Sequence, residues 1–136
     1  MQLIVCLDDR DGMLFNRRRQ SKDKAVCADI LELTAGSKLW MNSYSAGQFD
    51  PEEKNIIADE VFLEKAGEQD YCFAENADIS AYADKVGRVI VYRWNREYPA
   101  DVRFPTEIFC CRWRLESRDD FTGNSHECIT REIYEL

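Results

Sequence analysis

The order of short apolar segments along the chain is the feature that most constrains its fold. Leu3 to Leu7 is continuously apolar, as expected of a parallel strand that is covered on both faces. In the next segment Val26, Ile30 and Leu33 recur at helical spacing. Strand-like and helix-like segments then alternate as far as Trp94. This alternation predicts an α/β domain with a mostly parallel sheet.

Turn and cap residues place the boundaries of these segments. Ser21 is the expected N-cap of the first helix, Asp23 lies in its first turn and Gly36 can end it. We expect strands at 38–41, 55–58, 71–74 and 88–94, and short helical segments at 43–49, 59–67 and 78–85.

The final third of the chain has a different periodicity. Ile108 to Ser117 and Glu127 to Glu135 both alternate apolar and polar residues, and Asp119 to Asn124 separates them. Two such runs predict a long antiparallel hairpin with one buried face at the edge of the sheet.

The length and composition predict one domain, residues 1–136, with a single core. No apolar run approaches the roughly 18 residues that a membrane span needs. Residues 1–9 are not expected to be a signal peptide, because they lack a basic leader and their apolar run ends at Asp8 and Asp9. We expect a soluble, cytoplasmic protein, either a monomer or a homodimer, with no membrane partner.

The formal net charge of −8 argues against nucleic acid as a partner. The positive charge is concentrated at Arg17-Arg18-Arg19 with Lys22 and Lys24. This cluster is interpreted as a solvated loop that enters a helix. The alternative is a loop that faces an anionic ligand, either a phosphate or a carboxylate.

The six cysteines lie in apolar stretches and are interpreted as reduced core thiols of a cytosolic protein. Cys110 and Cys111 are adjacent and would point to opposite faces of a strand. The chain has one histidine, His126, and no CxxC motif, so no metal site is expected. A hydrolase or nuclease has no support on this ground.

The order of elements, taken with several short motifs, resembles dihydrofolate reductase over nearly the whole chain. Leu3-Ile4-Val5 followed by Gly12-Met13 resembles the first strand and mobile loop of that family. Lys54 to Ile57 is similar to its KNIIL strand, and Arg103-Phe104-Pro105 to its HFP segment. Residues 121–126 lie where the last hairpin of the family turns. The resemblance implies a three-layer fold, with a mostly parallel mixed sheet flanked by helices and ending in a long antiparallel hairpin.

The resemblance also implies a catalytic carboxylate on the first helix, and the chain departs from the family there. Spacing back from Leu39-Trp40-Met41 places that position at Val26, which cannot ionise. Asp23 and Asp29 lie about one helical turn to either side. A shift of the helix would bring one of them into the catalytic position; otherwise both are solvent-facing or dipole-stabilising acids.

The cofactor side departs from the family as well. Glu75-Asn76 stands at the Gly-Gly pair that lets the backbone approach the dinucleotide phosphates. Asn42 to Ser45 replaces the family's Gly-Arg-x-Thr, so Ser43 stands where an arginine would grip phosphate. Tyr92 is bulkier than the family's threonine. Repulsion by Glu75 and lost space predict weak or absent NADPH binding, so no cofactor is expected.

Such a fold leaves a cleft at the ends of its strands. Its candidate liners are Asp8, Met13, Asn42, Ser43, Ser45, Glu75, Asn76 and Tyr92. Each has an ordinary structural alternative, such as a helix cap for the asparagines or a buried strand aromatic for Tyr92. His126 is interpreted as structural and Cys72 as an inert buried thiol.

Three functions follow from these features. The first is a small-molecule-binding domain for a nucleotide- or pterin-like ligand, without classical NADPH-dependent reduction. The second is a divergent NADPH-dependent reductase that uses Asp23 or Asp29. The third is an interaction or assembly module that uses the aromatic and arginine residues of the last hairpin: Arg112, Trp113, Arg114 and Tyr134.

Overall fold

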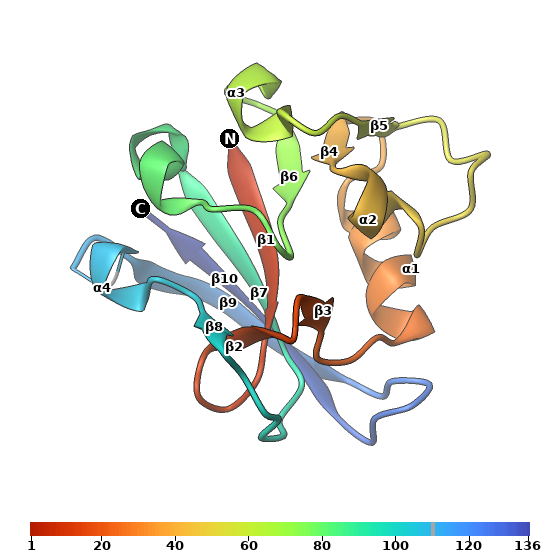
Figure 1. Cartoon of the computed structure of the whole chain (residues 1–136), viewed down its shortest axis with the longest axis vertical. Helices are drawn as coiled ribbons and strands as arrows, with labels where there is room; N and C mark the ends of the chain where they lie inside the picture. Colours follow the sequence, from red (N-terminus) through yellow and green to blue (C-terminus); the bar gives the residue numbers. More distant parts are fainter. Residues whose placement is uncertain (110) are drawn as a thin grey trace.

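The structure is a computed structural model that describes residues 1–109 and 111–136. Its main sheet has, within the described residues, strands β1 (Gln2–Leu7), β4 (Leu39–Met41), β5 (Ile56–Ala58), β6 (Tyr71–Phe73), β7 (Arg88–Arg93), β9 (Arg114–Phe121) and β10 (Ile129–Glu135). Their spatial order is β5-β4-β6-β1-β7-β10-β9 (Figure 1). The first five of these are parallel, and β10 is antiparallel to both β7 and β9. This is the mostly parallel mixed sheet that the sequence predicts.

Short helices and a small second sheet complete the chain. The helices are α1 (Lys24–Leu33), α2 (Ser43–Ala46), α3 (Phe62–Lys65), the 3₁₀ helix η1 (Ser80–Lys85) and α4 (Thr106–Phe109). The second sheet joins β2 (Gly12–Phe15), β3 (Arg18–Arg19) and β8 (Val102–Arg103) in the order β3-β2-β8. No described helix has the length and apolar character that a bilayer crossing requires.

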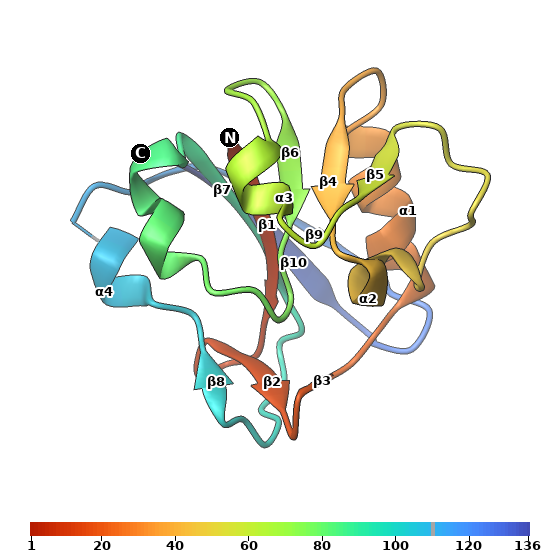
Figure 2. The same cartoon turned by 45° about the horizontal axis from the view of Figure 1, so that its top comes forward.

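Two apolar clusters cover the two faces of the main sheet, because successive strand side chains point to opposite sides. Ile4 packs with Val26 and Ile30 of α1 on one face. Leu3 and Val5 pack with residues of α3, η1 and α4 on the other. Figure 2 shows α1 on one side of the sheet and η1 and α4 on the other. The three layers agree with the fold expected from the sequence.

The first helix begins two residues later than expected. Asp23, not Ser21, is its N-cap, and the Asp23 side chain accepts a hydrogen bond from the backbone N–H of Ala25 at 2.8 Å. A carboxylate at the N-cap both accepts backbone hydrogen bonds and favours the helix dipole. The helix ends at Leu33, and Gly36 follows with a φ of +82°, a conformation that suits glycine.

The last hairpin forms, but its first strand lies later than the alternation predicts. The segment from Thr106 to Phe109 is the helix α4, and the strand begins only at Arg114. Cys110, and with it the expected opposition of Cys110 and Cys111, lies outside the described residues. β9 then extends through Asp119 and Asp120, which were expected in the turn.

The prediction that one face of this strand is buried is also wrong. Leu115 is half exposed, because β9 is the edge strand and most of its residues are exposed. Trp113 is half-buried and stacks on Tyr134 with ring centroids 4.1 Å apart. Cys111 and Cys128 are exposed, so these two are not core thiols, whereas Cys72 is buried.

Candidate functional site

Several of the sequence-predicted site residues follow the carboxyl ends of parallel strands. Asp8 follows β1, Asn42 follows β4, and Glu75 and Asn76 follow β6 closely. Because these strands are parallel neighbours, their carboxyl ends meet at one edge of the sheet. The fold therefore brings together residues that are far apart in sequence.

Glu75 is the centre of this group, and its carboxylate is fully engaged. Arg19 donates from Nε to Oε2 at 2.9 Å and from Nη2 to Oε1 at 3.1 Å. Ser45 Oγ and Gln48 Nε2 donate to Oε1 at 2.8 and 2.9 Å. The Glu75 side chain is 7% exposed and that of Arg19 is 21% exposed. A buried carboxylate with a bidentate arginine partner and two further donors is well satisfied.

Arg19 also fixes the β2–β3 hairpin to α2. Its guanidinium carbon lies 4.2 Å from the centre of the Tyr44 ring, and its backbone N–H donates to the Tyr44 hydroxyl at 3.0 Å. Burial opposes the charge on Arg19, but the hydrogen bond and charge of Glu75 outweigh it and raise the guanidinium pKa above its ordinary value. The arginine cluster does face an anion at this residue, and that anion is the chain's own carboxylate.

Sequence reasoning missed Arg19 and Gln48 as partners of Glu75, and Tyr44 as a partner of Arg19. The one hint in the sequence was the alternative interpretation of residues 17–19 as a loop that faces an anion. Arg19 and Glu75 are 56 residues apart, so no local pattern could pair them.

Two other predicted liners join the same edge of the sheet. Asn42 caps α2 by accepting from the Ser45 backbone N–H at 3.0 Å, and its Nδ2 donates to Asn76 Oδ1 at 2.6 Å. Ser43 Oγ instead donates to Glu60. Asn42 therefore has the structural role of a helix cap, which was the alternative interpretation of this residue.

A cavity of about 230 Å³ lies beside Glu75 and Asn76. Met13 lines it, and so do Ile79 and Pro105. Three of the predicted liners therefore share one small hollow.

Asp8 organises the loop that leads to β2. Its carboxylate accepts from the backbone N–H groups of Arg10, Gly12 and Tyr98 and from the Gln20 side chain. Burial raises the Asp8 pKa, but these hydrogen bonds outweigh burial and lower it overall. A Cβ on residue 12 would come within 2.8 Å of Asp8, so the loop requires glycine there.

Tyr92 lies in β7 and is fully buried, as a strand aromatic would be. Its hydroxyl donates to Asp29 Oδ2 at 2.6 Å, and Arg131 Nη1 donates to the same oxygen at 2.8 Å. Burial and the adjacent Asp29 raise the pKa of Tyr92 well above its ordinary value. Asp29 is thus paired with an arginine beneath α1.

Val26 packs into the apolar cluster under α1 and is 3% exposed. The position that spacing assigns to the family's catalytic acid is therefore a core residue here.

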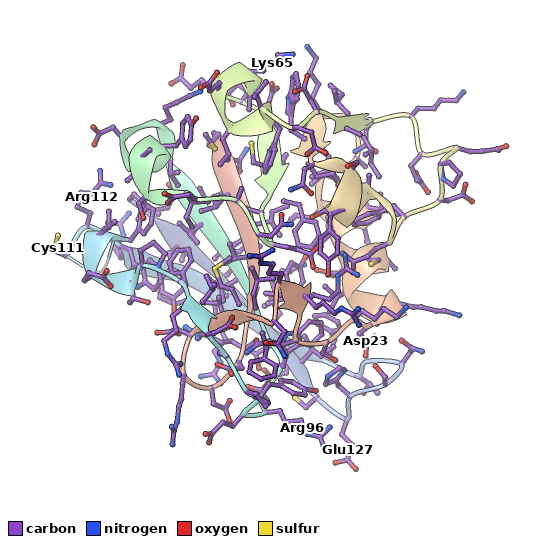
Figure 3. All side chains as sticks on the ribbon, viewed as in Figure 1. Asp23, Lys65, Arg96, Cys111, Arg112 and Glu127 are labelled. Carbon is purple, nitrogen blue, oxygen red and sulfur yellow. The ribbon has the colours of Figure 1, made fainter. Side chains whose placement is uncertain are left out.

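Asp23 is the second candidate acid, and its carboxylate has no exposed surface. Besides Ala25, it accepts from the backbone N–H groups of Asn124 and Ser125, both at 2.8 Å, from Ser125 Oγ and from His126 Nδ1 at 3.0 Å. Burial raises the Asp23 pKa, but the hydrogen bonds outweigh it and hold the pKa far below the ordinary value. Figure 3 shows Asp23 at the start of α1, beside the β9–β10 connection.

His126 continues this network on the other side of its ring. Its Nε2 lies 3.0 Å from the Tyr98 hydroxyl and 3.2 Å from Ser21 Oγ, and the ring stacks on Trp94 at 4.7 Å. Ser21 and His126 are 105 residues apart. Sequence reasoning treated His126 as a lone histidine because nothing local connects it to Ser21 or Asp23.

A hollow of about 520 Å³ opens between α1, α2 and the β9–β10 connection. Cys27, Leu31 and Phe49 supply apolar lining, and Lys24, Asp50 and Glu53 supply charged lining. No local pattern in the sequence indicates this hollow, because its lining comes from three separate segments. Among the described residues, no group of three or more His, Cys, Asp or Glu side chains could hold a metal ion.

Sequence comparison gives no match, either to a protein-family model or to a curated protein. Comparison of structures does: dihydrofolate reductase from Enterococcus faecalis, solved as a complex with NADP(H) and RAB-propyl, superposes with a TM-score of 0.68. The match covers 98% of this chain and 94% of that chain at 10% sequence identity. Likeness at this identity establishes the fold, and the chain therefore has a dihydrofolate reductase-like α/β fold.

Proposed function

We propose that this chain is a small-molecule-binding domain with a dihydrofolate reductase-like fold that does not carry out NADPH-dependent reduction. The observation that carries the proposal is the saturated Glu75 carboxylate. The family resemblance assigns this position to the dinucleotide phosphates, and here Arg19, Ser45 and Gln48 already donate to a carboxylate.

Charge and desolvation both act against a diphosphate at this position. A phosphate would be repelled by Glu75, and displacing Glu75 would leave a buried charge without its partner. The guanidinium of Arg19 is already paired with Glu75 and is not free to bind a phosphate. No cofactor is therefore part of the proposal.

The hollow between α1 and α2 supports a ligand of moderate size. Its volume of about 520 Å³ lies within the range of small-molecule sites, which combine apolar walls with a few polar groups. Leu31 and Phe49 provide apolar walls, and Gln48 and Asp50 line the hollow beside them. A flat nucleotide- or pterin-like heteroaromatic compound fits this description.

A thermal-shift panel of NADPH, NADH, folates and flavins tests the proposal. We expect a folate or flavin to raise the melting temperature and NADPH to leave it unchanged. Stabilisation by NADPH at micromolar concentration would contradict the argument from Glu75.

Two matched variants locate the ligand. Ala28 lines the hollow, whereas Glu32 is exposed one helical turn later and does not line it. Ala28→Tyr should abolish the shift that a ligand produces, and Glu32→Tyr should preserve it. Equal shifts in both variants would place the ligand elsewhere.

The alternative of a divergent reductase needs a free acid, and both candidates are engaged. Asp23 accepts five hydrogen bonds and Asp29 is paired with Arg131. NADPH oxidation with dihydrofolate should be absent in the wild type. Turnover that is lost in Asp23→Asn or Asp29→Asn would establish the reductase instead.

A further inference from the structure

Three side chains near the start of α1 form a relay from a hydroxyl to a buried carboxylate. Ser21 Oγ lies 3.2 Å from His126 Nε2, and His126 Nδ1 lies 3.0 Å from Asp23 Oδ2. We propose that Ser21 is a nucleophile for acyl transfer, with His126 as its general base and Asp23 as the residue that orients the imidazole. The substrate class is a small ester that carries an anionic group.

The hydrogen bonds determine where the imidazole proton resides. An ionised carboxylate can only accept, and Asp23 is held ionised by backbone N–H groups. His126 therefore carries its proton on Nδ1 and presents a lone pair at Nε2. Ser21 Oγ can donate to that lone pair, which is the arrangement that a serine nucleophile requires.

Packing fixes the ring in this orientation. His126 is 5% exposed in its side chain, and its ring is stacked on Trp94 at an interplanar angle of 23°. Asp23 Oδ2 would also stabilise the imidazolium that forms when Nε2 takes a proton. Tyr98 Oη lies 3.0 Å from the same nitrogen and competes with Ser21 for it.

The substrate class is inferred from a nearby segment of the surface, a hollow of about 470 Å³. Gln20, the residue before Ser21, and Tyr98, which shares His126 Nε2 with it, both line this hollow. Arg18 and Arg19 line it as well, and no acidic residue does within the described chain. Because Arg19 is bound to Glu75, the exposed Arg18 is the cation that would attract an anionic ester.

The proposed reaction has two balanced halves. Ser21 Oγ forms a bond to the ester carbonyl carbon while its proton passes to His126 Nε2; the bond to the alcohol oxygen then breaks, and Nε2 returns the proton to the departing alcohol. In the second half, water gives a proton to Nε2 and its oxygen bonds to the acyl carbon. The acyl–Ser21 bond breaks, Ser21 recovers its proton and a carboxylic acid leaves.

The first experiment is covalent labelling of the purified chain with diisopropyl fluorophosphate, followed by peptide mass mapping. We expect the label on Ser21, and mapping separates this residue from Ser125, which contacts Asp23. Ser21→Ala should abolish labelling. Ser37→Ala, a control at a serine of similar exposure outside the network, should leave it unchanged.

Two further variants test the roles of the neighbours. His126→Gln removes the base and should slow labelling about a hundredfold. Tyr98→Phe removes the competing hydroxyl and should speed it. The melting temperature of each variant is measured alongside, so that a loss of folding is not taken for a loss of reactivity.

The second experiment measures release of nitrophenol from 4-nitrophenyl acetate and from the anionic 4-nitrophenyl hydrogen succinate. We expect faster release from the succinate ester, and Arg18→Ala should remove this preference. Absence of label on Ser21, or equal labelling in the wild type and His126→Gln, would overturn the proposal. Neither experiment measures a ligand in the hollow between α1 and α2, so the binding proposal can fail independently.

Discussion

At the scale of single residues, Asp23 connects the start of α1 to a turn about a hundred residues later in the chain. Its carboxylate accepts from the backbone of Asn124 and Ser125 and from its own helix. Gly123 lies against it so closely that a Cβ there would contact the Asp23 oxygen. One carboxylate therefore serves as helix cap and as anchor for the last hairpin.

Asp23→Asn keeps an N-cap oxygen but removes the charge. We expect a loss of about 2 to 3 kcal/mol in the free energy of unfolding at neutral pH, since hydrogen bonds to charged groups are worth about 1.5 to 3 kcal/mol. Urea denaturation measures the loss. Asp78→Asn is the control, because Asp78 is exposed and, among the described residues, accepts only from Ser80, and it should change stability little.

The same carboxylate gives a pH dependence with a definite sign. The folded-state pKa of Asp23 lies below the unfolded-state value, so the folded state binds fewer protons there. The contribution is complete above about pH 4, the ordinary range of an aspartate, and is lost as the pH falls below it. The stability difference between wild type and Asp23→Asn should therefore shrink in acid. A constant difference down to about pH 2 would contradict this.

The cysteines differ in reactivity because their burial differs. Burial raises the pKa of Cys72 to about 12 and that of Cys27 to about 11, whereas Cys111 and Cys128 are exposed. Figure 3 shows Cys111 projecting outward from the edge of the molecule.

Ellman's reagent on the native chain should react rapidly with the exposed thiols. Cys128→Ser should remove one fast-reacting thiol, because the thiolate is the reactive form and a buried thiol is inert. Cys72→Ser should leave the fast phase unchanged. A fast phase that falls in Cys72→Ser would show that β6 opens readily.

At the scale of elements, the β2–β3 hairpin illustrates how a local turn and a distant ion pair cooperate. Asn16 and Arg17 have φ values of 52° and 64°, as in the type I′ turns that join two-residue hairpins. The hairpin places Arg19 against Glu75 and Tyr44. This contact holds the hairpin over the strand ends.

Arg19→Ala should release that hairpin. We expect about 2 kcal/mol less stability, below the 3 to 5 kcal/mol of a fully buried pair because Arg19 is partly exposed. Faster hydrogen exchange in residues 12–19 would identify the segment that is released. Arg10→Ala removes an exposed pair with Glu97 and should cost less than about 0.5 kcal/mol.

At the scale of the whole molecule, the sheet has one long exposed edge. β9 is that edge, and it carries Arg114, Glu116, Arg118, Asp119 and Asp120. Charged residues on an edge strand oppose pairing with a second sheet. The two ends of the chain both contact Gly87. The Gly87 N–H donates to the Met1 carbonyl, and the Leu136 N–H donates to the Gly87 carbonyl.

We expect a monomer on this physical ground. Sedimentation velocity over a wide range of protein concentration should give one species of unchanged mass. Replacing the exposed Arg118 and Asp120 together by valine should promote association through β9. A wild-type dimer would favour the assembly module, with the last hairpin as its surface.

The sequence predicted the elements whose signals are local. The run Leu3 to Leu7, the helical spacing from Val26 and the alternation in Ile129 to Glu135 each report the burial of a single segment, and each is confirmed. The prediction of a half-buried strand from Ile108 is wrong. Thr106 to Phe109 forms a short helix instead, and Leu115 on the edge strand β9 is half exposed.

What the sequence determined by itself was the fold, because hydrophobic periodicity and element order restrict the topology to few choices. It also placed Glu75 and Asn42 at the strand ends. Only the tertiary structure paired Arg19 with Glu75 and brought Ser21, His126 and Asp23 into one line of hydrogen bonds. Those contacts join segments 56 to 105 residues apart, and they form only when the sheet has closed the distance.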